Sequence, residues 1–284
     1  MRQPDGSIRQ YGAVPPARAT LVLSAYRIGG GRSGNLAREQ IRVLKTSVPY
    51  VTGVQNRHPT VGGVDGETMP NARKRGPLQL RAGGRAVTAS DFEVLAREVA
   101  PDAGRIACLP ASELDGGVRL LVVPPVISDH LGRTERTDLT EPPAELLRRV
   151  RDHLEIRRLI GTRLLVQPPE YQGVTVVARV VATDGTRPDA LQEAALQSLY
   201  AYLSPHHGGK DGNGWPFGRA VQAFDISTAL SVVPGLGSVQ ELLLFPADED
   251  GNRGGATPRI ELQPGQLVYS YQHQVRVQLP TEAQ

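Results

Sequence analysis

Alternating and helical patterns of apolar residues cover most of the chain and predict short elements of both kinds. The clearest strand is 172–181, where every second residue from Val174 to Val180 is apolar. Apolar residues spaced three and four apart predict amphipathic helices within 85–100, 142–161 and 188–205. The pattern therefore predicts a fold that mixes helices and strands.

The first 84 residues lack such helical spacing and are dense in Gly and Pro. Residues 19–28 alternate as a strand does, and 43–56 indicates a second extended segment because Pro49 opposes a helix. Residues 58–80 have the composition of a loop. We therefore expect residues 1–84 to form a β-rich, loop-rich N-terminal segment.

The remainder of the chain predicts two α/β modules. Residues 85–168 give the order short strand, helix, two strands, helix and strand, which is typical of a small ferredoxin-like sandwich. Residues 169–284 give a second α/β module, and the alternation of 265–278 predicts a β-hairpin at its end. The expected fold class is α+β with several small modules: two α/β sandwich (ferredoxin-like) units preceded by a β-rich irregular segment.

Charge and composition narrow the classes of function. The chain has 284 residues with 32 basic and 29 acidic side chains, which gives a formal net charge of +3. The signs alternate, and the densest basic cluster, 72–76, has no aromatic neighbour, so we expect no nucleic-acid surface. No run of 18 apolar residues occurs, so we expect no membrane insertion. Cys108 is the single cysteine, which allows no internal disulfide and is typical of a small buried residue.

Gly29, Gly31 and Gly34 match the spacing G-x-G-x-x-G of a dinucleotide-binding loop. Such a loop also needs a closely packed helix and an acidic residue about 20 residues downstream, at the end of the next strand. Asp65 lies about 30 residues beyond the glycines and inside a loop, and no Lys-Ser or Lys-Thr follows them. The sequence therefore favours a tight turn, and a nucleotide-binding enzyme that uses Gly29–Gly34 is the least favoured alternative.

Other chemical motifs are missing from the sequence or incomplete. Neither G-x-S-x-G nor H-E-x-x-H occurs. The pair His206-His207 is typical of a helix C-terminus, and 248–255 resembles part of a calcium loop but lacks its spaced acids. No sequence signature pairs Cys108 with any of the histidines, which are His58, His130, His153, His206, His207 and His273. We therefore expect no enzyme, catalytic residue, cofactor or metal.

The segment 214–219, GWPFGR, contains the single tryptophan of the chain. Two aromatic residues around a proline and between glycines indicate either a plug that fixes this loop to the core or an anchor for a protein interface. Trp and Arg are enriched at binding hot spots, which is why the second interpretation stays open. The candidate interface or structural anchor residues are Trp215, Phe217 and Arg219.

Several short motifs follow one another along the chain: YRIGGGRSGN, SVPYVTGVQN, GGVDGET, ARKRGPLQLRAGGRAVTASDFEVLAREVAP and GWPFGR. Their order resembles the baseplate J-like wedge family of contractile phage tails and phage-tail-like contractile injection systems. The resemblance spans roughly residues 26–277. Members of the family are usually longer at the N-terminus, so contacts made by that additional region are not carried over.

The resemblance implies a structural role without catalytic residues. It implies a baseplate wedge subunit that assembles six-fold around a hub and couples baseplate opening to sheath contraction. The implied partners are a second wedge protein, the sheath-initiating baseplate protein, hub or spike proteins and, in some members, a tail fibre. The implied location is the cytoplasm during assembly and then a phage tail or phage-tail-like particle. A stand-alone protein-binding module is the alternative that the residues leave open.

Overall fold

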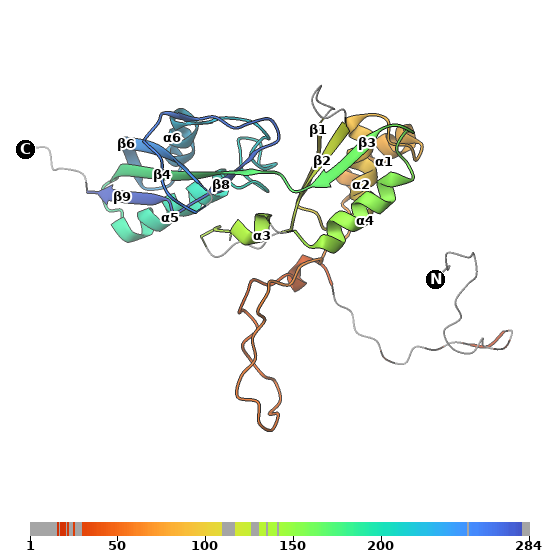
Figure 1. The fold of residues 1–284 in the computed structure, drawn as a ribbon. Coiled ribbons are helices and arrows are strands. Elements are labelled where there is room, and N and C mark those ends of the chain that lie inside the picture. Colours follow the sequence, from red (N-terminus) through yellow and green to blue (C-terminus); the bar gives the residue numbers. More distant parts are fainter. Residues whose placement is uncertain are drawn as a thin grey trace, which may run out of the picture.

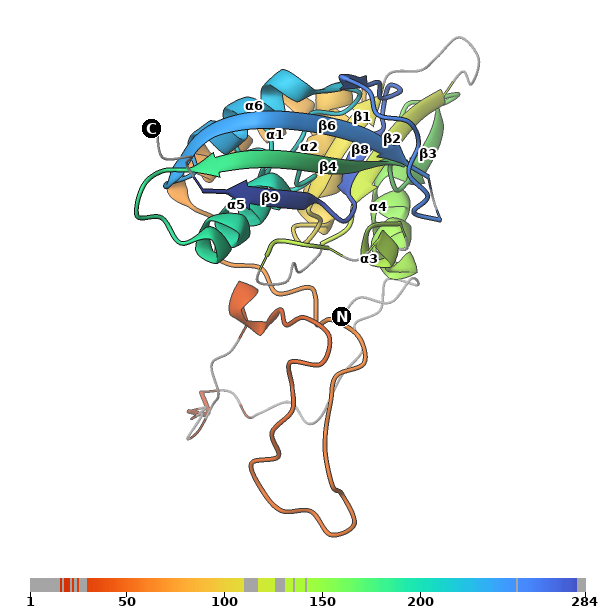
Figure 2. The same ribbon diagram turned by 90° about the vertical axis from the view of Figure 1, so that its left-hand side faces the viewer.

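Two α/β modules lie side by side, and a long loop extends away from both of them (Figures 1 and 2). The modules are joined where β3 (Arg163–Gln167) leads into β4 (Tyr171–Ala182). The α+β class with several small modules is therefore confirmed. The computed structural model describes residues 16, 18–20, 22, 25, 30–109, 117–125, 131–134, 136–140, 142–248 and 250–279.

The first module is a three-stranded sheet packed against helices. β1 (Arg105–Leu109) pairs antiparallel with β2 (Gly117–Val123), and β2 pairs parallel with β3. α2 (Ala89–Val99) contacts β1, α4 (Ala144–Glu155) contacts β3, and the two helices contact each other. Large buried residues of its core are Phe92, Leu95, Leu120, Val122, Val150 and Leu154.

The order of elements expected for this module is nearly complete. Its first strand is reduced to a single bridge between Ala86 and Arg158. α2 then begins with a capping box: the Thr88 hydroxyl accepts the Asp91 N–H at 3.3 Å, and the Asp91 carboxylate accepts the Thr88 N–H at 2.8 Å. The short α3 (Arg136–Thr140) precedes α4.

The N-terminal segment differs from the expectation. Residues 19–28 lie largely outside the described part of the chain, and no strand forms among the described residues before 84. One 3₁₀ turn, η1 (Arg32–Gly34), is followed by an irregular loop and then by α1 (Met69–Ala82), where a loop was expected. α1 forms in spite of Pro77 because Thr68 caps it and because it packs on α2, and such tertiary contacts override local propensity.

The second module has β4 as its central strand. β6 (Leu236–Ala247) pairs antiparallel along one edge, and α5 (Pro188–Tyr202) and α6 (Ala223–Ser231) pack against the sheet. A two-stranded sheet of β5 (Val221–Gln222) and β7 (Arg259–Ile260) lies beside it. Large buried residues of the core are Val174, Val176, Val180, Leu199, Trp215, Leu230 and Leu244.

The C-terminal strands do not form the expected hairpin. β8 (Leu267–Ser270) and β9 (Gln274–Gln278) run in the same direction, and each pairs in parallel with a different part of β4. The residues between them step along β4, since the Tyr271 N–H donates to the Val174 carbonyl at 2.8 Å. Alternation predicts that a segment is a strand but does not identify its partner, so the pairing was predicted wrongly.

Within the described residues, no helix combines the length and the apolar character needed to cross a bilayer. The division of the chain into independent domains at residues 84 and 168 stays a prediction.

Candidate functional site: the junction between the modules

Arg105, the first residue of β1, connects the first module to the second. Its Nη1 donates hydrogen bonds to the carbonyl oxygens of Pro205 at 2.8 Å and Trp215 at 2.7 Å. Its Cζ lies 4.7 Å from the ring centroid of Phe217. Burial lowers the pKa of Arg105, yet a guanidinium stays charged at neutral pH. A hydrogen bond to a charged group contributes about 1.5–3 kcal/mol, so this side chain alone stabilises the junction appreciably.

His206 makes a second contact across the junction. Its Nε2 lies 2.8 Å from the carbonyl oxygen of Pro124, in the first module. Burial lowers the pKa of His206 to about 4, so the ring is neutral at pH 7 and the proton on Nε2 can be donated to that carbonyl. α5 ends at Tyr202, so His206 and His207 do not sit at the helix C-terminus as predicted; the chain carries His206 onward to the junction.

Gly214 leaves room for the Arg105 contact. Its φ of +89° lies in the left-handed region, which residues other than glycine rarely adopt. A Cβ on Gly214 would overlap the carbonyl oxygen of Pro205 and lie 2.7 Å from Nη1 of Arg105. The glycine at the start of GWPFGR is therefore required by both its backbone angle and its neighbours.

Trp215 is fully buried in the core of the second module. Its Nε1–H donates to the carbonyl oxygen of Arg219 at 2.9 Å, and its ring makes a T-shaped contact with Tyr202, with centroids 5.7 Å apart. The Arg219 guanidinium lies 5.3 Å over the indole and pairs with Asp225 at 2.9 Å. These contacts fix the loop to the core.

The structure thus brings Trp215 and Arg219 into direct contact, whereas Phe217 turns outward to Arg105. The motif holds one module to the other through the Trp215 carbonyl and the Phe217 ring. Its use as an anchor for a different protein stays a prediction. Sequence reasoning missed Arg105, because no local pattern distinguishes it from the other arginines of the chain.

The glycine-rich loop forms a tight turn closed by an acid of the same chain. The Asp65 Oδ1 accepts the Arg32 N–H at 2.8 Å, and a Cβ on Gly31 would lie 2.7 Å from that oxygen. Gly29 lies outside the described residues, and Gly34 ends the three-residue η1. A phosphate site would need free amides at the N-terminus of an α-helix, so this geometry favours the turn.

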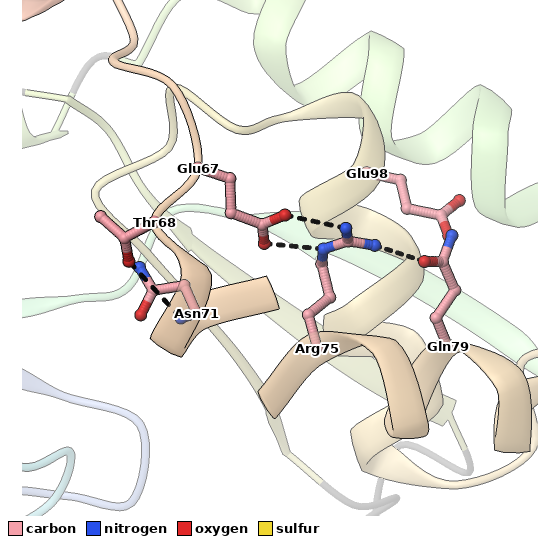
Figure 3. Close-up of polar contacts among 6 residues, drawn as sticks. All are labelled: Glu67, Thr68, Asn71, Arg75, Gln79 and Glu98. Atoms are coloured by element: carbon pink, nitrogen blue, oxygen red, sulfur yellow. Dashed lines mark hydrogen bonds and ion pairs between the residues drawn. The ribbon is translucent and has the colours of Figure 1, made fainter. Parts of the chain in front are cut away.

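A polar network attaches the end of the long loop to α1 and α2 (Figure 3). The Glu67 carboxylate accepts two hydrogen bonds from Arg75, each 2.8 Å long. Arg75 also donates to Gln79, and Gln79 donates to Glu98 on α2. These side chains line an open cleft of about 1090 Å³. The network therefore fixes the position at which the loop leaves the first module.

For the side chains that could act as a nucleophile or a metal ligand, the surroundings in the fold indicate their role. Burial raises the pKa of the Cys108 thiol to about 12, so the thiol is protonated at neutral pH. Asp248 accepts the Asn252 backbone and side-chain N–H groups at 2.8 and 3.0 Å, which closes a turn. His130 lies outside the described residues. In the described part of the chain, no three His, Cys, Asp or Glu side chains gather in a group that could hold a metal ion.

Comparison with known proteins gives a likeness in fold. No protein-family model matches the chain, and no curated protein matches it. Among solved structures, it is similar to a chain in the cryo-EM structure of the anti-feeding prophage baseplate, six-fold symmetrised. The similarity has a TM-score of 0.50 and 20% sequence identity, and covers 89% of this chain and 52% of that chain. This chain therefore shares its fold with a chain of the anti-feeding prophage baseplate and spans about half of the length of that chain.

Proposed function

We propose that the chain is a structural wedge subunit in the baseplate of a contractile tail or injection apparatus. The observation that carries this proposal is the fold shared over 89% of the chain with a chain of the anti-feeding prophage baseplate. The ordered motifs from YRIGGGRSGN to GWPFGR support the same role through their resemblance to the baseplate J-like family. The proposed role is mechanical and involves no catalysis.

The proposed mechanism uses the junction between the modules. Each module has its own buried core, so each can move as a rigid body. Arg105 and His206 make polar contacts between the modules, and such hydrogen bonds can exchange partners when the modules move. We propose that opening of the baseplate changes the packing at this junction. This change in the wedges would couple baseplate opening to contraction of the sheath.

The proposed partners are other baseplate proteins. They are a second wedge protein, the sheath-initiating protein and the hub or spike, with a tail fibre as a further attachment. The chain would join them during assembly in the cytoplasm and remain in the finished particle.

Affinity purification from the producing cell tests the proposal. A tagged copy of the chain is expected to co-purify with sheath, tube and hub proteins in a complex of megadalton size. A monomer that elutes alone from cells that contain particles would contradict the baseplate role and favour a stand-alone binding module.

A further inference from the structure

Residues Leu36–Thr60, called the arm below, form the long loop that extends from the body of the molecule (Figures 1 and 2). Its two sides are joined near the base by side chains. The Thr60 hydroxyl accepts the Leu36 N–H at 2.7 Å, and the Asn56 side-chain oxygen accepts the Ile41 N–H at 2.9 Å. The Asn56 amide also donates to the Ala37 carbonyl at 2.8 Å. These contacts hold the base of the arm in one conformation.

The outer part of the arm exposes many apolar side chains to water. Every residue from Arg38 to Gln55 is exposed. Exposed large apolar side chains gather there: Ile41, Val43, Leu44, Val48, Tyr50, Val51 and Val54. So many exposed apolar side chains within 14 residues are typical of a binding surface.

The tip of the arm holds a tyrosine where a glycine would be unstrained. The Val51 N–H donates to the Val48 carbonyl at 3.1 Å, so Pro49 and Tyr50 are the central residues of a turn. Tyr50 has φ of +67°, the conformation that the third residue of a type II turn requires and that glycine adopts most easily. Its side chain is completely exposed, with a relative accessibility of 105%. The turn therefore holds the ring in water, in a backbone conformation that costs free energy for any residue other than glycine.

The arm also carries the excess positive charge of the chain. It contains Arg38, Arg42, Lys45 and Arg57 against Glu39, so its net charge is 4 − 1 = +3. The whole chain has 32 − 29 = +3, and the remainder therefore has 28 − 28 = 0. A surface that complements the charge of the arm is acidic, and the remainder of a second copy has no net negative charge.

We propose that the arm binds a neighbouring, different protein chain of the particle, in a groove with an apolar floor and an acidic rim. Tyr50 fills the floor as the anchor, and Arg42 and Lys45 pair with carboxylates at the rim. This inference rests on the proposed function, because the neighbouring chain is a baseplate protein.

Photocrosslinking within assembled particles tests the arm. The full chain carries p-benzoylphenylalanine at position 50, or at Ile160 as a control, since Ile160 is equally exposed but lies in the first module. After irradiation of purified particles, position 50 is expected to give one adduct with a different protein, whose linked peptide contains apolar residues flanked by Asp or Glu. Combining Arg42→Glu with Lys45→Glu is expected to lower the adduct yield by about tenfold or more, because like charges then face each other.

Other outcomes overturn the inference. An adduct with a second copy of the chain, with nucleic acid or with lipid would show a different partner. An adduct yield that the charge reversal leaves unchanged would contradict the acidic rim. No adduct above the level of the Ile160 control would show that the arm binds nothing. If the chain is in the particle and position 50 links to nothing, the arm inference fails and the proposed function stands. If the chain is missing from the particle, both fail.

Tyr50→Gly separates binding from folding. Glycine adopts the positive φ without strain, so the melting temperature of the free chain is expected to stay the same or rise. Incorporation of the variant into particles, in competition with the unchanged chain, is expected to fall about tenfold or more, as for loss of a hot-spot residue. Equal incorporation of the two chains would overturn the role of Tyr50.

Discussion

The Arg105 guanidinium donates a hydrogen bond of 2.7 Å to the carbonyl oxygen of Trp215, 110 residues further along the chain. The two residues belong to different modules, and each is fixed by its own surroundings: Arg105 by β1 and Trp215 by burial in the second core. The pair shows two functions of one residue in GWPFGR: the Trp215 ring is buried in the second core, and its backbone carbonyl accepts the hydrogen bond from the first module.

Arg105→Met removes the donors and keeps the apolar stem of the side chain. The carbonyls of Pro205 and Trp215 then lose their partner, and the free energy of unfolding is expected to fall by about 1–3 kcal/mol. Urea unfolding measures the change. The control is Arg276→Met, at an exposed position of β9, and its stability is expected to stay within about 0.5 kcal/mol of that of the unchanged protein. Equal effects of the two substitutions would contradict the role of Arg105.

Gly214→Ala introduces a Cβ where the junction has no room. The new atom overlaps the Pro205 carbonyl and opposes the φ of +89°, so we expect the variant to lose about 1–3 kcal/mol of stability. Thermal unfolding of Gly255→Ala provides the comparison, because a Cβ at Gly255 meets nothing within 4 Å. A Gly214→Ala variant as stable as Gly255→Ala would show that the loop adopts a different conformation.

Trp215→Ala leaves a large cavity in the second core. Trp215 is fully buried, and such a truncation is expected to cost about 3–5 kcal/mol of stability. Phe224→Ala removes an aromatic ring that is 78% exposed and serves as the matched control, with an expected change within about 0.5 kcal/mol. If Trp215→Ala unfolds at the same denaturant concentration as the control, the indole is not part of the core.

Stability is expected to fall as the pH drops below neutral, because buried histidines stay neutral in the folded chain. Burial lowers the pKa of His273 to about 3, and the nearby charge of Arg253 acts in the same direction. Its Nδ1 accepts the Val176 N–H at 3.0 Å, and its ring packs against Tyr200. In the unfolded chain His273 binds a proton near pH 6.5, whereas in the folded chain it does not. The contribution of His273 to stability is therefore fully present above that pH and is lost progressively toward pH 3.

Between about pH 6.5 and pH 3, His273 alone lowers the free energy of unfolding by about 1.4 kcal/mol for each unit by which the pH falls. The lowered pKa of His206 adds a loss in the same direction down to about pH 4. Urea unfolding at pH 7 and pH 5 measures the sum, and His273→Phe is expected to reduce the slope. Phe224→Ala, which removes an exposed side chain that does not titrate, is the control and is expected to leave the slope unchanged. A stability that does not change between pH 7 and pH 5 would contradict this account.

Local signals in the sequence predicted most of the two modules. Thr88 and Asp91 stand at the spacing of a capping box, and the apolar stripes of α2, α4 and α5 have helical periods, so these helices were expected. β4 was expected from its alternation in the same way. These signals depend only on neighbours within a few residues.

The features that the sequence did not predict depend on distant contacts. α1 is stabilised by Glu67 and by α2, which outweigh the low helix propensity of Gly76 and Pro77. β8 and β9 alternate like a hairpin, but β4 decides their pairing. The Arg105–Trp215 bond has no local signal, because the two partners are brought together only when both modules are folded. The positive φ of Tyr50 was not predicted for a different reason: the turn is local, but it places a tyrosine where glycine is usual.

A cryo-EM reconstruction of contractile particles from the producing cell tests the baseplate role. We predict that both modules of this chain fit the density in six symmetry-related positions, or a multiple of six, around the hub, with the arm in contact with a neighbouring protein. A complete, well-resolved baseplate in which no density fits this chain would contradict the account.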